Sequence, residues 1–168
     1  LSNQGVVAPD LGNAKQATLL SRLLNLPVAA GSKQRLADDR VVIDSIVGDV
    51  TGKKAIVLDD EIATGGSIME IVNRLGDFGC NEVSVACTHG LFTGKAVERL
   101  TSSSRITEVV STNTVPAPAH FPGLQHLSVA GLFADAIDRI HRGRSVSKLF
   151  NGVDPAYAPP PQAPEGQF

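Results

Sequence analysis

Short apolar runs alternate with amphipathic stretches over the first 110 residues. Strands are predicted where four to seven mostly apolar residues lie between turn signals. These runs cover residues 5–8, 27–30, 41–47, 55–58, 83–87 and 106–110. Helices are predicted between them, with the clearest from Ser67, where apolar residues at 68, 71, 72, 75 and 78 share one face that ends at Gly79. This alternation predicts an α/β fold, a mostly parallel sheet with helices on both faces.

Two segments break the alternation. Residues 31–40 are polar and charged without a period, which predicts a flexible loop near residues 31–41. Residues 115–123 are rich in Pro and Ala and lead to Ser128, a predicted helix N-cap. Apolar residues at helical spacing follow to Ile140, and we expect this stripe, like that after Ser67, to lie in the core. The pattern places one domain at 1–150 and a proline-rich tail at 151–168.

Composition narrows the possible partners. The 168 residues carry 15 basic and 17 acidic side chains, so a broad nucleic-acid surface is not expected. No apolar run approaches the roughly 20 residues that cross a bilayer, and no signal-type start is visible, so we expect a cytoplasmic protein that does not bind membranes. Cys80 and Cys87 lack metal-ligand spacing and are interpreted as buried small apolar residues.

Residues 55–72 carry the candidate chemistry. Asp59 and Asp60 follow a predicted buried strand, and residues 64–67, with the sequence TGGS, come directly before a predicted helix. Free N–H groups at a helix N-terminus bind anions, and glycines let the backbone approach a phosphate. Carboxylates at the same edge suit sugar hydroxyls or Mg²⁺ bound through water. Together these features predict a ribose phosphate site.

A simpler interpretation is that the two aspartates only end a strand and the TGGS segment only caps a helix. Each half alone is common, whereas the combination is less expected by chance. A P-loop is excluded by spacing, because the GDVTGK and GLFTGK segments have three residues where that motif needs four. His89 also follows a strand, and we assign it no catalytic role because a structural, hydrogen-bonded histidine fits equally well.

The segment AIVLDDEIATGGSI resembles the phosphoribosyl-diphosphate loop of type I phosphoribosyltransferases. Further segments make the resemblance narrower: VVAPDLGNAKQA, GSKQR, VACTHGLFTGKAVERL, STNTVP and the closing SVSKLF. In order along residues 5–150, they resemble the C-terminal half of ribose-phosphate pyrophosphokinase, also called phosphoribosyl-diphosphate synthetase. The resemblance implies a phosphoribosyltransferase-like fold and transfer of the diphosphoryl group of MgATP to the 1-hydroxyl of ribose 5-phosphate.

The resemblance also implies residue roles. Lys33 and Arg35 match a pair that acts on the transferring phosphates, and Asp10 matches an acidic position linked to Mg²⁺. Asp59, with Asp60 beside it, would contact ribose hydroxyls. The 5-phosphate would be held by Ala63, Thr64, Gly65, Gly66 and Ser67. ATP is the implied co-substrate, and a homo-oligomer built from dimers into hexamers is the implied assembly.

Departures from the family pattern leave alternatives open. Ala63 stands where Asp is common, and Gln16 stands where a basic residue is usual. The resemblance does not cover the family's N-terminal half, so we expect this chain alone to bind ribose 5-phosphate with little turnover. A non-catalytic regulatory partner of the synthetase remains one alternative. A free-standing phosphoribosyltransferase is the other, although no segment that would cover a base is visible.

Overall fold

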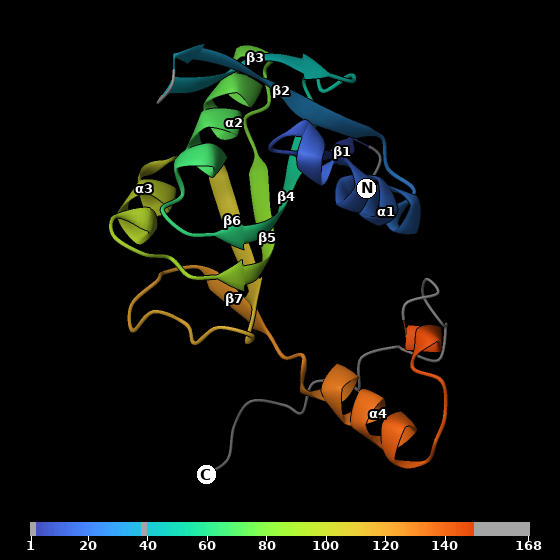
Figure 1. Cartoon of the computed structure of the whole chain (residues 1–168). Helices are drawn as coiled ribbons and strands as arrows, with labels where there is room; N and C mark the ends of the chain where they lie inside the picture. The colour runs from blue at the N-terminus through green and yellow to red at the C-terminus, as the bar shows by residue number, and fades with distance from the viewer. Residues whose placement is uncertain (1–2, 38–39, 150–168) are drawn as a thin grey trace. The chain divides into compact units, whose positions relative to one another are not determined.

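The aliphatic runs of the sequence become the strands of one sheet. The computed structural model describes residues 3–37 and 40–149 (Figure 1). Its sheet has the order β3-β2-β1-β4-β5-β6-β7. The strands are β1 (Gln4–Ala8), β2 (Val28–Ala37), β3 (Arg40–Val47), β4 (Lys54–Ile62), β5 (Val83–Gly90), β6 (Ile106–Thr112) and β7 (Leu124–Leu127). Neighbouring strands pair in parallel, except β2 and β3, which are antiparallel, so the predicted mostly parallel sheet is confirmed.

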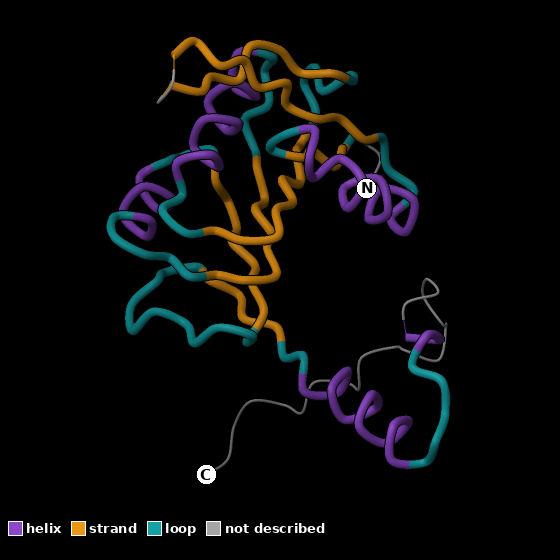
Figure 2. The backbone as a smooth tube through the Cα atoms, viewed as in Figure 1, coloured by secondary structure: helices purple, strands orange, loops and turns teal. Residues whose placement is uncertain are grey.

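Crossover segments supply the helices that parallel strands require. They are the short 3₁₀ turn η1 (Leu11–Asn13), α1 (Ala14–Leu24), α2 (Gly66–Asp77) and α3 (Ala96–Ser102). Figure 2 shows how helix and strand segments alternate along the chain. All of these elements belong to the first of two units into which the chain divides, Leu1–Ser128. The second unit, Val129–Phe168, is described separately below.

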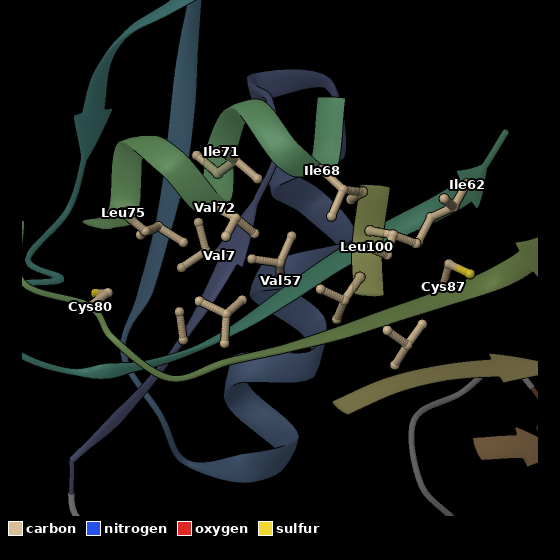
Figure 3. Close-up of a cluster of buried hydrophobic side chains, with 14 of the residues drawn as sticks. Val7, Val57, Ile62, Ile68, Ile71, Val72, Leu75, Cys80, Cys87 and Leu100 are labelled. Carbon is tan, nitrogen blue, oxygen red and sulfur yellow. The ribbon is translucent and has the colours of Figure 1, made fainter. Parts of the chain in front are cut away.

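Alternate residues of β1 face the two sides of the sheet. Val7 lies in a core cluster with Ile71 of α2 and Leu100 of α3 (Figure 3). Its neighbour Val6 lies in a smaller cluster with Ala17 of α1. Because successive side chains of a strand point to opposite faces, α1 covers one face while α2 and α3 cover the other. Helices on both faces were predicted, and this arrangement confirms it.

The predicted loop at residues 31–41 is wrong as secondary structure. Residues 31–37 continue β2 and pair with β3, with Lys33 opposite Ile43 and Arg35 opposite Val41. Residues 38 and 39 lie outside the described ranges. The polar residues of this segment do not show the alternating pattern of a strand. Backbone hydrogen bonds to the apolar strand β3 nevertheless stabilise an extended conformation, because they do not depend on side-chain type.

Two further boundaries differ from the sequence prediction. Asp59 and Asp60 do not end their strand, because β4 continues to Ile62 through pairing of Glu61 with His89 and of Ile62 with the end of β5. Strand β7 was not predicted, and it pairs in parallel with β6 at the sheet edge. Both differences arise from pairing with a neighbouring strand, which local hydrophobicity does not report.

The second unit contains α4 (Ala130–His141) and the short turn η2 (Ser147–Leu149). The N-cap of α4 is Val129 rather than the predicted Ser128. None of the residues of α4 is buried, and Phe133, Ile137 and Ile140 are 58%, 65% and 69% exposed. Within its own unit the apolar stripe of α4 is therefore not buried, and the expectation that it lies in the core of the domain stays a prediction. The predicted domain limit at 150 and the tail at 151–168 stay predictions, since residues 150–168 lie outside the described ranges.

Candidate functional site

The end of β4 and the start of α2 enclose an open pocket of about 160 Å³. Its lining is one continuous run of chain, residues 61–68, together with a carboxylate two positions earlier. The lining residues are Asp59, Glu61, Ile62, Ala63, Thr64, Gly65, Gly66, Ser67 and Ile68. The structure therefore brings Asp59 together with all five residues of the predicted phosphate loop, at the carboxyl edge of the sheet where open α/β sheets bind ligands.

Backbone geometry makes the helix end of this pocket suited to an anion. Gly65 is the N-cap of α2 and has φ 73°, a left-handed conformation that favours glycine. No side chain caps the helix. The N–H of Met69 donates a 3.0 Å hydrogen bond to the carbonyl of the N-cap residue, Gly65. The N–H groups of the first turn have no carbonyl partner within the helix. Together with the helix dipole, they favour binding of a negative ligand.

An acidic network adjoins the other end of the pocket. Asp10, the N-cap of η1, accepts a 3.1 Å hydrogen bond from the backbone N–H of Asn13. The side-chain amide of Asn13 donates to Oδ1 of Asp59. The same oxygen accepts a 3.0 Å hydrogen bond from the backbone N–H of Asp60. Asn13 thus links the turn after β1 to the end of β4, and it holds the carboxylate of Asp59 in one orientation.

The neighbouring carboxylates titrate differently. Burial, together with the neighbouring Asp60 and the nearby negative charge of Asp10, raises the pKa of Asp59 to about 6. The hydrogen bond shared with Asp59 lowers the pKa of Asp60, which lies in an exposed position. As the pH falls, the inner carboxyl, Asp59, therefore takes up a proton before the outer one, Asp60, does. Burial also raises the pKa of the Cys87 thiol, the strand partner of Asp59, to about 12.

Lys33 and Arg35 lie on β2, two positions apart, in the hairpin formed with β3. Their side chains are outside the described part of the structure, so their predicted contact with phosphates stays a prediction. Asp60 is not among the residues that line the pocket, and Asp10 reaches the site through Asn13.

The donor set agrees with a magnesium ion that is shared with a substrate. Asp10 is close enough for its charge to act on Asp59, and Mg²⁺ is commonly held by one or two carboxylates plus substrate phosphates and waters. Within residues 3–37 and 40–149 there is no group of three or more His, Cys, Asp and Glu side chains that could hold a metal ion alone. The protein side chains therefore fit a partial ligand set.

Some residues of the site were missed by sequence reasoning. Glu61 lines the pocket, and its position directly after the two aspartates was a signal that could have found it. Asn13 is the N-cap residue of α1, where its side chain forms no capping hydrogen bond and instead binds Asp59. Arg99 donates a 2.9 Å hydrogen bond to the carbonyl of Thr64. No local sequence signal connects residues 35 positions apart.

The cysteines and the histidine to which no catalytic role was assigned have structural contacts. Cys80 and Cys87 are free and buried. His89 Nδ1 forms a 2.9 Å hydrogen bond with Thr114 Oγ1, which gives it the structural contact that the sequence left open. Over the described ranges, no helix has both the length and the apolar composition needed to cross a bilayer.

Comparison with known proteins places this site in a family. A ribose-phosphate pyrophosphokinase of Caldanaerobacter subterraneus is 44% identical over 147 residues, which cover 86% of this chain and 46% of the relative. A Streptomyces coelicolor protein whose name refers to the same activity is 52% identical over 153 residues, which cover 90% of this chain and 48% of the relative. The chain thus spans about half the length of the curated relatives that it matches.

The fold is shared with a solved structure. The crystal structure of phosphoribosylpyrophosphate synthetase from Mycobacterium smegmatis matches with a TM-score of 0.75 and 36% identity, over 84% of this chain and 46% of that one. Residues 43–151 match the family described as phosphoribosyl synthetase-associated domain, a range that contains β4, the pocket and α2. The chain belongs to the phosphoribosyl synthetase-associated domain family.

Proposed function

We propose that this chain is the ribose-5-phosphate-binding part of a ribose-phosphate pyrophosphokinase. The observation that carries the proposal is the pocket at the carboxyl edge of the sheet, which is lined both by the N-terminus of α2 and by a half-buried carboxylate, Asp59. A ribose 5-phosphate has a dianion at one end and hydroxyls at the other, so it matches both ends of this pocket. Names of relatives that share 44% identity support the same substrate.

In this proposal the loop and the carboxylates bind opposite ends of the ligand. The backbone N–H groups of residues 64–67 bind the 5-phosphate, and the hydroxyls of Thr64 and Ser67 add donors. Asp59 and Asp60 accept hydrogen bonds from ribose hydroxyls, which orients the sugar. Ala63 contributes only backbone here, so phosphate binding does not depend on the carboxylate that is common at this position in the family.

Asp10 and Asp59 would hold Mg²⁺ together with substrate oxygens. When bound, the ion would neutralise charge on the transferring diphosphoryl group of ATP, the co-substrate in this proposal. Lys33 and Arg35 add positive charge to the same phosphates and align them for attack by the 1-hydroxyl. The raised pKa of Asp59 fits this arrangement, because a nearby cation would favour its ionised form. Assembly into dimers and hexamers stays a prediction of the resemblance.

Binding of ribose 5-phosphate, measured by calorimetry, tests the proposal at the site. We expect Gly66→Asp to weaken binding at least tenfold, because it adds a carboxylate beside the bound phosphate, a change of about 1.4 kcal/mol. A Cβ at Gly66 meets only Thr64 Oγ1 at 3.7 Å, so the substitution is sterically tolerated. The matched control is Ser104→Asp, exposed and just before β6 at the amino edge of the sheet. Equal binding by both variants would contradict the proposal.

Catalysis needs a second assay, release of AMP from MgATP and ribose 5-phosphate by the protein as its own gene encodes it. We expect AMP release, and we expect Lys33→Ala to lower it by about a hundredfold, since one removed transition-state charge contact costs roughly 10²–10³ in rate. Retained binding of ribose 5-phosphate without AMP release would instead favour the regulatory alternative. Product formation from phosphoribosyl diphosphate and a nucleobase would favour a phosphoribosyltransferase.

A further inference from the structure

The phosphate loop is held from behind by a second segment, the turn after β5 and the helix α3. Three successive carbonyls of the loop accept hydrogen bonds from this segment. The N–H of Phe92 donates to the carbonyl of Ile62 (3.0 Å), and the N–H of Thr93 donates to that of Ala63 (2.8 Å). Nη1 of Arg99 donates to the carbonyl of Thr64 (2.9 Å). Two of these donors belong to the backbone, so Arg99 is the side chain that completes the series.

Helix α3 also supports the loop by van der Waals packing. A Cβ placed on Gly65 would lie 3.6 Å from Leu100 and 3.7 Å from Ala96, so α3 is in van der Waals contact with the loop directly after Thr64. Leu100 and Ala96 are buried, whereas Arg99 is exposed and contacts the loop through its guanidinium. The apolar side of α3 thus fixes the distance to the loop, and Arg99 determines how the Thr64 peptide group is turned.

The turn that carries Phe92 is itself held in one conformation. Phe92 has φ 44°, a left-handed value that is uncommon outside glycine. Its ring packs edge to face on Phe121, with centroids 4.9 Å apart, and covers Gly90, where a Cβ would come within 2.3 Å of the ring. The backbone donors at 92 and 93 therefore come from a fixed support. Arg99, on a flexible side chain, is the adjustable member of the three.

The planar trans peptide bond between Thr64 and Gly65 links the orientation of the Thr64 carbonyl to that of the Gly65 N–H. The carbonyl of one residue and the N–H of the next point in opposite directions, because they share one rigid plane. Holding the carbonyl of Thr64 toward α3 therefore holds the N–H of Gly65 away from α3. Gly65 is the N-cap of α2 and lines the pocket, so this N–H stands at the site where we place the phosphate.

We propose that Arg99 is a positioning residue of the phosphate site: by binding the Thr64 carbonyl, it fixes the Gly65 peptide group that presents its N–H to the ligand. The ligand class, a phosphate monoester such as ribose 5-phosphate, rests on the proposed function. The positioning itself concerns the free protein as well, so it is testable without any ligand. The guanidinium also brings one positive charge close to a pocket that Asp59 and Glu61 make acidic.

The test combines a measurement on the free protein with a binding measurement. In Arg99→Ala, we expect the ¹⁵N order parameters of Gly65 and Gly66 to fall from about 0.85 toward 0.6, values that separate rigid from flexible backbone. We expect binding of ribose 5-phosphate to weaken about threefold to tenfold, the range for loss of one partly exposed charged hydrogen bond. Global stability in urea should stay within error, because Arg99 is exposed.

Two further variants separate positioning from charge and from general helix effects. Arg99→Lys retains the charge and one donor, and we expect it to restore part of both the order and the affinity. Arg22→Ala, exposed in the last turn of α1 on the other face of the sheet, is the matched control and should change neither. Unchanged order parameters in Arg99→Ala would overturn the proposal, and so would full restoration of affinity by Arg99→Lys without restored order. If the parent protein fails to bind ribose 5-phosphate, the proposed function fails, while the order parameters still decide the role of Arg99.

Discussion

Helices α2 and α4 have the same length and the same kind of apolar stripe, yet only α2 buries that stripe within its own unit. Each has 12 residues. In α2, Ile68, Ile71, Val72 and Leu75 are all buried against the sheet (Figure 3). In α4, Phe133, Ile137 and Ile140 are exposed within their own unit. A stripe at 3.6-residue spacing therefore predicts that a helix forms with one apolar face, and it does not predict what that face contacts.

The two helices also differ in what stabilises them. Tertiary packing normally contributes most of the stability of a helix in a protein, and α2 has that packing. On α4 the described contacts are local: Arg139 forms an ion pair with Asp135 at 3.0 Å, and Arg142 forms one with Asp138 at 2.6 Å. Pairs at i and i+4 each contribute a few tenths of a kcal/mol. Substitutions matched between the two helices should therefore have very different effects.

The largest difference is expected for matched isoleucine substitutions. Ile71→Ala removes a fully buried side chain from the core of the first unit and should lower the free energy of unfolding by about 2–5 kcal/mol, because it leaves a cavity. Ile137→Ala, at a position that is 65% exposed, should lower it by less than about 1 kcal/mol. Urea unfolding followed by circular dichroism measures both. A loss at Ile137 as large as that at Ile71 would show that the α4 stripe is covered in solution.

A second difference concerns carboxylates: Asp59, near α2, is half-buried, whereas those of α4 form ion pairs within the helix. The pKa of Asp59 is raised from 3.8 to about 6, so the folded state holds its proton more tightly than the unfolded chain does. The contribution of this proton to the free energy of unfolding is fully present below pH 3.8, and it is lost as the pH rises through 6. Asp59→Asn removes the titration. We expect it to raise the free energy of unfolding by about 1–2 kcal/mol at pH 8, after allowance for solvent screening, and to have little effect at pH 3.5.

That experiment is done in metal-free buffer, because a bound cation would favour the ionised form of Asp59. The matched control is Asp60→Asn, at an exposed neighbouring carboxyl whose pKa is lowered by its hydrogen bond with Asp59. Removal of that group should not produce a gain at pH 8. If Asp59→Asn destabilised the protein equally at both pH values, the carboxyl would be acting through its hydrogen bond with Asn13, and burial of charge would have no part.

Sequence reasoning succeeded where local pattern and tertiary contact agree. The run from Asp59 to Ser67 is short, so its strand, loop and helix place the pocket residues together without help from distant parts of the chain. It failed where pairing or packing with a distant segment determines the local structure. Residues 31–37 form a strand because β3 pairs with them. Arg99 reaches Thr64 across 35 positions, a contact that only the packing of α3 on the loop creates.

The smallest effect is expected from the surface ion pairs of α4. Asp138→Asn removes the partner of Arg142 and should destabilise the helix by about 0.3–0.5 kcal/mol, because an exposed i, i+4 pair contributes only that much. The N–H of Arg142 donates to the carbonyl of Asp138 at 2.9 Å, so its hydrogen exchange reports on this turn directly. We expect exchange to become about twofold faster at low salt and to match the parent in 1 M salt, where the attraction is screened. The equivalent change in α2, Asp77→Asn at the ion pair with Arg74, should leave the exchange of core amides nearly unchanged, since those amides open only with the whole sheet. An increase above tenfold in α4 would mean that its last turn depends on more than local pairing.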